Sequence, residues 1–338
     1  MKREAPRRRQ PPESYVEGIL KGDRVVLSQA ITLVESGLSE DQDLAAQVVE
    51  ECLPHSGKSL RIGITGVPGV GKSTFIEELG QFVIRKHDRR LAVLAIDPTS
   101  SKSRGSILGD KTRMSELARN EHAYIRPSPT GGSLGGVARK TREAIVLCEA
   151  AGFDVVIVET VGVGQSETAV HSMVDFFLLL MLAGAGDELQ GIKRGIMEMA
   201  DALAITKADR ENVGAARRAR AEYSQALGLF PEGAGGWRAR VILTSAVERT
   251  GIDEVWQCFL EHETLMKSKG VFEARRREQA RYWFEAAIGD LLLESFQSNE
   301  RVRTLRAGLE AQVLDKKRSP FSAARELVRV HLGQEAES

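Results

Sequence analysis

The stretch RIGITGVPGVGKST, residues 61 to 74, decides the fold of this chain. It combines an apolar strand, a glycine-rich loop and the start of a helix, and the loop matches the pattern Gly-x-x-x-x-Gly-Lys-Ser. Leu60 to Thr65 is strand-like, and Phe75, Ile76 and Leu79 recur at helical spacing. The alternative, a chance glycine-rich turn, is disfavoured because both flanks fit. The sequence therefore predicts a P-loop that holds a nucleoside triphosphate.

The residue types in this loop suit a polyphosphate. Successive backbone N–H groups must converge on phosphate oxygens, and a side chain at Gly69 or Gly71 would obstruct that approach. Lys72 is placed to reach the β- and γ-phosphates, as a catalytic candidate, and the Ser73 hydroxyl is placed to ligate Mg²⁺. The predicted phosphate-binding residues are Gly66, Val67, Pro68, Gly69, Val70, Gly71, Lys72, Ser73 and Thr74.

Composition narrows the class of protein. The chain has 338 residues with 47 Lys plus Arg and 47 Asp plus Glu, so nothing global indicates nucleic acid or an anionic membrane as a partner. The three cysteines are widely spaced and form no disulfide framework, which fits a reducing, cytoplasmic location. The longest apolar run, Phe176 to Ala183, is far shorter than the roughly 20 residues that span a bilayer.

The pattern along the chain predicts four regions. We expect a disordered basic tail at 1–13, a helical region at 14–57, a nucleotide domain at 58–269 and a second helical region at 270–338. The predicted strands are Leu60 to Thr65, Leu91 to Ile96, Ala123 to Ile125, Phe153 to Val158, Phe176 to Leu182, Ala202 to Ile205 and Val241 to Leu243. Continuous apolar runs are typical of parallel strands covered on both faces. The expected fold is an α/β P-loop domain with a mostly parallel central sheet flanked by helices, extended by helices at both ends.

Acidic residues near the ends of two strands are candidate Mg²⁺ ligands. Asp97 and Glu159 each follow an apolar run, and a cation bound to a triphosphate takes one or two carboxylates besides the P-loop hydroxyl of Ser73. The alternative role for Asp97 is to cap a helix or turn before Pro98. For Glu159 the alternative is weaker, because burying an unpaired carboxylate would be costly. Asp110 is either a third metal-site residue or the N-cap of a following helix.

A charged stretch between glycines, GAGDELQGIKRG at residues 184 to 195, follows the fifth predicted strand. One of its cations, Lys193 or Arg194, would approach the γ-phosphate when a partner closes the loop, as arginine fingers do. A solvated helix start explains the same residues equally well.

The stretch ALAITKAD, residues 202 to 209, indicates which base is bound. It is similar to the Asn-Lys-x-Asp signature of GTPases, in which the aspartate accepts hydrogen bonds from two guanine N–H groups that adenine lacks. Asp209 and Lys207 match the signature, whereas Thr206 replaces the usual asparagine and puts one contact that braces the loop in doubt. Ser245 and Ala246 follow the last strand, as in a second guanine-contacting loop. Together these residues favour GTP.

Several uncommon strings then occur in the order of one family: GVPGVGKST, GSILGDKTRM at 105 to 114, CEAAGFDVV at 148 to 156, ETVGVGQSE at 159 to 167 and GDELQGIKRG at 186 to 195. The chain resembles the MeaB/ArgK GTPases, relatives of the methylmalonic aciduria type A protein, over roughly residues 14 to 332. That family acts as chaperones of adenosylcobalamin-dependent acyl-CoA mutases.

The resemblance implies a set of roles. GTP or GDP would bind at the P-loop, with Thr206, Lys207, Asp209 and Ser245 to Val247 around guanine, and Mg²⁺ at Ser73, Asp97, Asp110 and Glu159. Hydrolysis would be slow and stimulated by a mutase partner, most naturally methylmalonyl-CoA mutase, with Lys193 in the coupling loop. The GTPase would gate cofactor loading, protection or reactivation, and the C-terminal helices would form a homodimer.

Two other classes share this core. A nickel-delivery GTPase would carry clustered Cys and His residues, but the six histidines here are isolated from one another and from the cysteines in sequence. A protein kinase or ATPase linked to amino-acid transport would need a site that accepts the phosphoryl group, and the sequence indicates none.

Overall fold

The computed structural model describes residues 9–96, 114–127, 134–160, 166–183 and 194–334. The chain divides into two compact units, Met1–Gln279 and Ala280–Ser338, each of which is described by itself. No helix among the described residues is long and apolar enough to cross a membrane.

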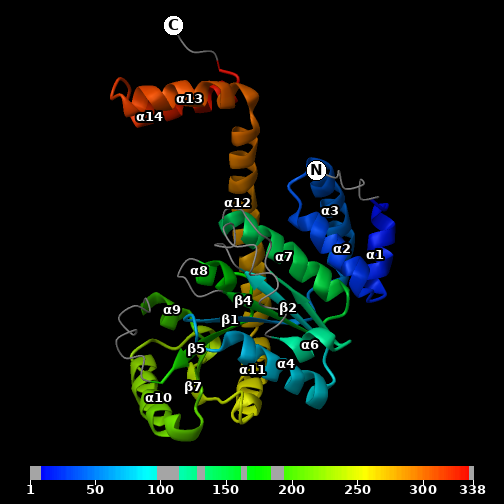
Figure 1. Ribbon diagram of the computed structural model, residues 1–338, viewed down its shortest axis with the longest axis vertical. Helices are drawn as coiled ribbons and strands as arrows, with labels where there is room; N and C mark the ends of the chain where they lie inside the picture. The colour runs from blue at the N-terminus through cyan, green and yellow to red at the C-terminus, as the bar shows by residue number, and fades with distance from the viewer. Residues whose placement is uncertain (1–8, 97–113, 128–133, 161–165, 184–193, 335–338) are drawn as a thin grey trace. The chain divides into compact units, whose positions relative to one another are not determined.

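The strands that the structure describes form one parallel, seven-stranded sheet in the order β3-β2-β4-β1-β5-β6-β7 (Figure 1). Their bounds are β1 Leu60–Gly66, β2 Leu91–Ile96, β3 Ala123–Arg126, β4 Val155–Thr160, β5 Phe176–Leu182, β6 Ala202–Thr206 and β7 Arg240–Leu243. The predicted α/β fold with a parallel central sheet is confirmed. Because all strands run the same way, their carboxyl ends share one edge, where α/β proteins place their ligands.

Helices cover both faces of the sheet, because successive side chains of a buried strand point to opposite sides. The helices of the first unit after β1 are α4 Lys72–His87, α6 Ser115–Arg119, α7 Leu134–Ala150, α8 Ser166–His171, α9 Arg194–Met199, α10 Val213–Leu227 and α11 Ile252–Ser268. Helices α4, α6 and α11 share one apolar core with Ile62, Ile64 and Leu178. Helices α9 and α10 pack on Leu179 and Leu203 of the opposite face, and α7 and α8 also lie on that side (Figure 1).

The N-terminal region is helical, as its apolar stripes predict. It comprises α1 Pro12–Leu20, α2 Arg24–Glu35 and α3 Ser39–Cys52. Asp23 ends the break between the first two helices, since its carboxylate accepts hydrogen bonds from Val25 N and Val26 N. Helix α1 begins two residues inside the segment that we expected to be a disordered tail. A proline at the first turn explains this start, because that position needs no N–H donor.

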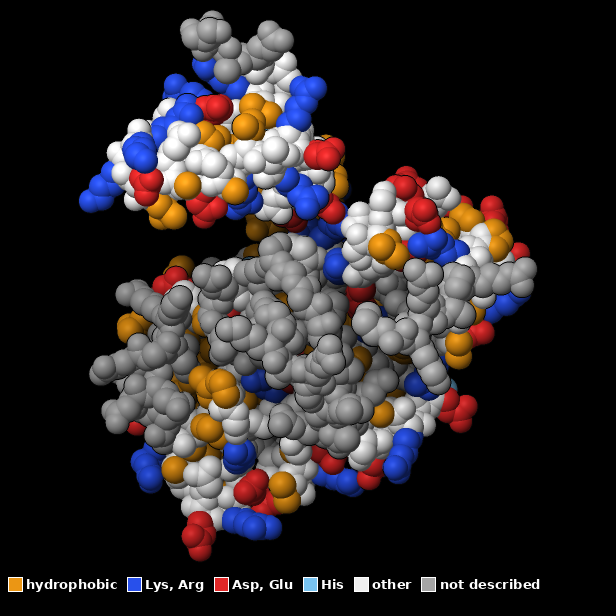
Figure 2. All heavy atoms as spheres, turned by 45° about the horizontal axis from the view of Figure 1, so that its top comes forward, with side chains coloured by type: hydrophobic (Ala, Val, Ile, Leu, Met, Phe, Trp, Pro, Cys, Tyr) orange, Lys and Arg blue, Asp and Glu red, His pale blue; other side chains and the backbone are white. Residues whose placement is uncertain are grey.

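The second unit contains the last part of α12 Val271–Ser298, followed by α13 Glu300–Leu314 and α14 Pro320–His331. The side chains of Asn299 and Ser319 cap the N-termini of α13 and α14. Among the described residues of this unit, the buried apolar side chains are Val302, Leu309 and Ala323. Many larger apolar side chains are exposed, and Figure 2 shows such side chains among charged ones on this unit.

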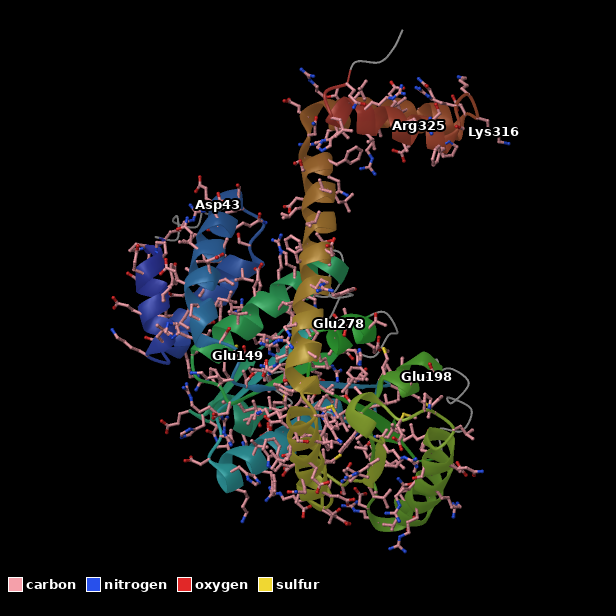
Figure 3. The ribbon with its side chains drawn as sticks, turned by 180° about the vertical axis from the view of Figure 1, so that it is seen from behind. Asp43, Glu149, Glu198, Glu278, Lys316 and Arg325 are labelled. Atoms are coloured by element: carbon pink, nitrogen blue, oxygen red, sulfur yellow. The ribbon has the colours of Figure 1, made fainter. Side chains whose placement is uncertain are left out.

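The amino-terminal edge of the sheet buries charges in closed pairs. Glu149 of α7, labelled in Figure 3, accepts from Arg61 Nε at 2.8 Å, Ser59 Oγ at 2.6 Å and Gly57 N at 2.7 Å. Burial alone would raise the pKa of Glu149, but these bonds and the Arg61 charge outweigh it and hold the pKa below its ordinary value. The network fixes the segment that enters β1.

A second closed pair at the same edge holds the first turns of α12. Arg276 donates to both carboxylate oxygens of Asp175, at 2.9 and 2.7 Å, and to the carbonyls of Gly57 and Ser59. Gln279 adds a bond of 2.8 Å to Val174 O. These bonds explain why the first turns of α12 belong to the first unit.

Candidate nucleotide-binding site

The P-loop connects β1 to α4 at the carboxyl edge of the sheet. Gly69 and Gly71 have φ angles of 81° and 95°, a left-handed region that other residues rarely adopt. At Gly66 the constraint is space, because a Cβ there would lie 2.6 Å from Leu180 O of the neighbouring strand. The glycines are therefore needed for two different reasons, backbone conformation at 69 and 71 and close strand packing at 66.

Lys72 is the first residue of α4, and its ammonium is turned back into the loop. Its Nζ donates to Gly66 O at 2.8 Å and to Val67 O at 3.3 Å. Burial lowers the pKa of Lys72, and the charges of Glu159 and Glu167 oppose that shift. A cation bonded to neutral carbonyls at a helix N-terminus is suited to binding an anion such as a phosphate.

Ser73 and Glu159 are brought together across the sheet. Glu159 lies within β4 rather than after it, paired in register with Ile64 of β1, and it is 7% exposed. Its Oε1 lies 3.5 Å from Ser73 Oγ. A hydroxyl and a carboxylate oxygen, both of the type that Mg²⁺ prefers, therefore face the same place beside the P-loop.

Three predicted site residues, Asp97, Asp110 and Lys193, lie outside the described residues. The strand leading to Asp97 ends at Ile96, whose register partner is Thr160, next to Glu159. Among the residues that the structure describes, no three His, Cys, Asp or Glu side chains form a group that could hold a metal ion.

The predicted base loop begins at the end of β6. Thr206 Oγ1 donates to Val70 O of the P-loop at 2.7 Å, and Lys207 Nζ donates to Gly69 O at 2.9 Å. Lys207 has a φ of 55°, and Asn212 supports that conformation by donating from Nδ2 to Lys207 O at 2.7 Å. The base loop and the P-loop are therefore bonded to each other.

Asp209 meets the second predicted guanine loop. Its Oδ2 accepts from Ser245 Oγ at 2.6 Å, and Ser245 Oγ accepts in turn from Glu248 N at 3.1 Å. The backbones of Ser245 and Thr250 form a closed bridge with two bonds of 3.0 Å, so the turn between them is well defined. Ala246 is half-buried and Val247 is exposed. The structure thus brings the carboxylate of Asp209 and this turn together.

Comparison with known proteins decides the family. A family model described as "Methylmalonyl Co-A mutase-associated GTPase MeaB" matches residues 27–301. The chain belongs to the MeaB family. This MeaB protein is therefore a GTPase, and the resemblance inferred from its sequence motifs is confirmed.

Relatives of the MeaB protein cover most of its length. It is 50% identical to a probable GTPase of Mycobacterium tuberculosis over 91% of this chain and 92% of that protein. It is 48% identical to the mitochondrial methylmalonic aciduria type A homolog of Mus musculus, over 91% of this chain and 76% of that protein. The crystal structure of a protein named LAO/AO transport system kinase superposes with a TM-score of 0.74 at 36% identity, covering 96% of this chain and 99% of that one.

Sequence reasoning missed two residues of the MeaB site. The first is Asn212, which supports the base loop. The sequence feature that could have indicated it is a polar residue three positions after the signature aspartate. Glu167 of α8 is 2% exposed, and its charge partly opposes the lowering of the Lys72 pKa by burial. The sequence feature that could have indicated Glu167 is a second acidic residue in the string ETVGVGQSE, which begins with Glu159.

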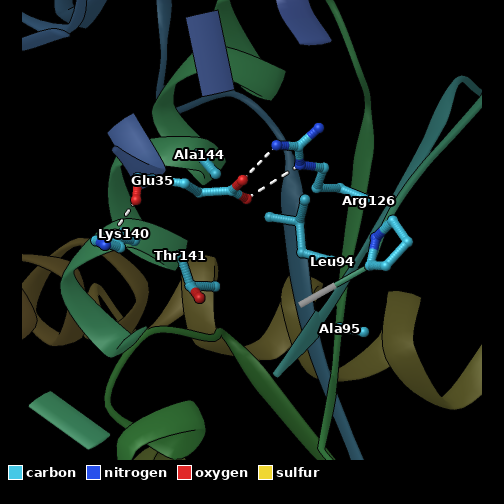
Figure 4. Close-up of a pocket in the computed structure, with 8 residues that line it drawn as sticks. Glu35, Leu94, Ala95, Arg126, Lys140, Thr141 and Ala144 are labelled. Carbon is cyan, nitrogen blue, oxygen red and sulfur yellow. Dashed lines mark hydrogen bonds and ion pairs between the residues drawn. The ribbon is translucent and has the colours of Figure 1, made fainter. Parts of the chain in front are cut away.

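Two cavities lie away from the P-loop. The smaller, at the ends of β2 and β3, measures about 10 Å³ and is too small for a ligand; it is bordered by the ion pair of Glu35 with Arg126 and by Lys140, which donates to Glu35 O (Figure 4). The ion pair fastens α2 to β3 of the sheet, and the bond from Lys140 joins α2 to α7. The larger, about 450 Å³, is an open groove at the amino edge whose lining includes His55 and Lys58.

Proposed function

We propose that this MeaB GTPase binds Mg²⁺·GTP at the carboxyl edge of its sheet and hydrolyses it slowly to GDP and phosphate. The observation that carries the proposal is the contact between two loops, the P-loop with Lys72 and the base loop with Asp209, at one edge of the sheet. In this proposal Lys72 holds the β- and γ-phosphates, and Asp209 accepts hydrogen bonds from guanine.

The residues beside the P-loop fit a magnesium ion. Ser73 and Glu159 would hold it, with Asp97 and Asp110 as further candidate ligands, because all four offer hard oxygen atoms. When bound, the ion neutralises charge that develops on the phosphate oxygens. The Glu159 carboxylate is positioned by its place inside β4, and Lys193 is the proposed cation that completes the site when a partner binds.

We further propose that the partner is an adenosylcobalamin-dependent acyl-CoA mutase, with methylmalonyl-CoA mutase first. The support is the family description, which names association with that enzyme. In this role the GTPase gates loading of the cobalamin cofactor and its protection or reactivation. The reaction is proposed to take place in the cytoplasm, where the three buried thiols of Cys52, Cys148 and Cys258 would stay reduced.

The proposed division of the chain has a helical region at residues 14–57, a nucleotide domain at 58–269 and a C-terminal helical region at 270–338. The C-terminal region is proposed to form a homodimer. Large apolar side chains exposed on its helices support this role, because monomeric proteins rarely leave such faces uncovered. They are Tyr282, Phe284, Ile288, Leu291, Leu292, Leu293, Leu305, Leu314, Phe321, Val328 and Leu332.

The experiment is to add purified methylmalonyl-CoA mutase to the wild-type chain and to measure GTP hydrolysis and complex formation. We expect a stable complex and at least a tenfold faster hydrolysis. A parallel assay with isobutyryl-CoA mutase distinguishes the mutase that is served. Neither binding nor stimulation by either mutase would overturn the partner assignment and would leave the GTPase intact.

The structural relative carries the name of a transport system kinase, and that name implies a competing activity for that protein. The same preparations therefore receive ATP and GTP in parallel. Phosphoryl transfer from ATP to a protein, with no preference for GTP, would replace the proposed function by that of a kinase.

A further inference from the structure

The hydroxyl of Thr206 lies between carbonyl groups of two different segments. Thr206 is the last residue of β6 and is 5% exposed. Its Oγ1 lies 2.7 Å from Val70 O of the P-loop and 3.2 Å from Met181 O of β5. The residue therefore sits where the phosphate-binding loop, β5 and the base loop meet.

One of these two bonds dominates. A hydroxyl carries a single proton, so it donates fully to one carbonyl at a time, and the shorter distance identifies Val70 O as that acceptor. The side chain of Val70 is completely buried, which fixes this part of the P-loop against the core. Removing the hydroxyl would leave a buried carbonyl without this donor, which is more costly than losing an exposed hydrogen bond.

The neighbouring contact is weaker. Lys207 Nζ donates to Gly69 O at 2.9 Å, so two adjacent side chains hold two adjacent carbonyls of the P-loop. The Lys207 side chain is long and exposed, and both water and side-chain entropy compete with its bond. We call these two hydrogen bonds, from Thr206 to Val70 O and from Lys207 to Gly69 O, the tether between the base loop and the P-loop. Most of its strength therefore depends on Thr206.

The tether continues to the base side of the site. Asn212 donates to Lys207 O, and Asp209 accepts from Ser245 Oγ, so residues 206 to 209 are bonded to the second guanine loop as well as to the P-loop. Thr206 and the Asp209 carboxylate, three residues along the chain, therefore belong to one hydrogen-bonded segment.

We propose that Thr206 is a positioning residue whose hydroxyl couples the phosphate-binding and base-binding halves of the site, and that this coupling slows the release of guanine nucleotide. The inference rests on the proposed function, since it takes Asp209 as the residue that binds guanine. The asparagine of the usual signature has two amide protons and could serve two carbonyls, whereas threonine has one. The tether in this chain therefore depends on a single proton.

The test uses the full chain and a fluorescent GDP analogue, with stopped-flow measurement of its release. Thr206→Val keeps the shape and replaces the hydroxyl by a methyl group, and we expect about tenfold faster release, equivalent to about 1.4 kcal/mol. Thr206→Ser keeps the hydroxyl and is expected to stay within about twofold of wild type.

Thr141→Val is the matched control. Thr141 is also 5% exposed, but its hydroxyl bonds at 2.9 Å to Val137 O within its own helix. We expect both valine variants to lose similar stability to urea, while release changes only in Thr206→Val. GDP should bind more tightly than GMP because its β-phosphate contacts the P-loop. We expect this difference in affinity to be smaller in Thr206→Val, because base binding no longer orders a P-loop that has lost the bond from Thr206.

Two results would overturn the inference. Release at the wild-type rate by Thr206→Val would show that the hydroxyl does not control it, and fast release by Thr206→Ser would assign the effect to side-chain size. A wild-type chain that binds no guanine nucleotide would instead overturn the proposed function, and the inference with it.

Discussion

Both edges of the sheet bury charged side chains, but these side chains have different hydrogen-bond partners at the two edges. At the amino edge, Glu149 and Arg61 form an ion pair, and Arg276 holds Asp175 with a second one. At the carboxyl edge, the ammonium of Lys72 donates to carbonyl oxygens of its own loop. One edge satisfies its charges with each other, and the other places a desolvated cation where an anion can bind.

This difference separates structure from function. A closed buried pair is costly to break, because removal of one partner leaves the other buried without a counter-charge. A desolvated cation adds little to folding, but it can interact strongly with a ligand in a site of low dielectric. Substitutions at the amino edge should therefore change stability, and those at the carboxyl edge should change activity.

The largest expected effect is that of Lys72→Ala. We expect GTP hydrolysis to fall about 1,000-fold or more, because the cation that faces the transferred phosphate is lost. The free energy of unfolding should stay the same or rise, because burial of this ammonium is unfavourable. Turnover assays and urea titration measure the two effects. Unchanged hydrolysis would remove Lys72 from the phosphate site.

Glu149→Ala tests the opposite edge. We expect a loss of about 3–5 kcal/mol in the free energy of unfolding, since Arg61 would stay buried without its partner. The affinity of the folded protein for GDP should not change. Arg89→Ala is a control, because its ion pair with Asp154 is exposed and worth about 1 kcal/mol or less. A drop in GDP affinity as large as the loss of stability would contradict the separation of the two edges.

Asp209→Asn sharpens the comparison within the carboxyl edge. We expect the preference for GTP over ATP to fall about 100-fold, because the variant loses the carboxylate that we propose accepts hydrogen bonds from guanine. The amide donor of asparagine matches the additional carbonyl of xanthine, so affinity for XTP should rise. Competition binding with the three nucleotides measures this change, and equal discrimination by the variant would exclude Asp209 from the base site.

At neutral pH the smallest effect is that of His262, which changes the pH dependence of stability at the amino edge. Burial between Phe176 and Trp237, and then the charge of Arg275, lowers the pKa of His262 to about 4. The unfolded chain takes up this proton near pH 6.5, so the folded state loses stability as pH falls from about 6.5 to 4, by about 1.4 kcal/mol per pH unit.

In urea titrations between pH 4 and 6.5, His262→Phe should lower the slope of the unfolding free energy against pH by the contribution of one proton. Asp201 acts in the opposite direction, because burial raises its pKa to about 6 and its protonation stabilises the fold as pH falls. His171, whose pKa burial also lowers to about 4, adds to the slope in both proteins. Because Asp201 Oδ1 lies 3.7 Å from His262 Nε2, the difference between wild type and variant reports His262 together with its effect on Asp201. Identical slopes would refute the assignment.

The sheet could be predicted from the sequence because its strands are apolar throughout. Leu91 to Ile96 and Phe176 to Leu182 have the predicted bounds. The fourth strand was placed two residues too early, since Phe153 is apolar but packs beneath the Arg90 side chain before the strand. Its last residue, Thr160, is polar and buried because its hydroxyl bonds to Thr65, a contact that no local pattern indicates.

The site was predictable where its chemistry is local and not where it depends on distant partners. The P-loop spacing places Lys72 and Ser73 beside the loop without further information. The Thr206 contact joins residues 136 apart in sequence, so the sequence placed this residue in the base loop, as a departure from the usual signature, but did not indicate its bond to the P-loop. Glu149 and Arg61 were missed for the same reason, because each taken alone is an ordinary charged residue.

The backbone bridge between Ser245 and Thr250 closes the second predicted guanine loop, so the number of residues in this turn is fixed by its main chain. Because main-chain atoms close this ring, the outward side chains at 247 and 248 can be exchanged without opening it. Arg249 is more constrained, since its φ is 56° and its side chain pairs with Glu78 at 3.0 Å. Gly251 is constrained, since a Cβ there would lie 2.0 Å from Leu243 O. Substitution libraries should therefore accept many residues at 247 and 248 and fewer at 249, and an added or deleted residue should misplace Ser245 against Asp209.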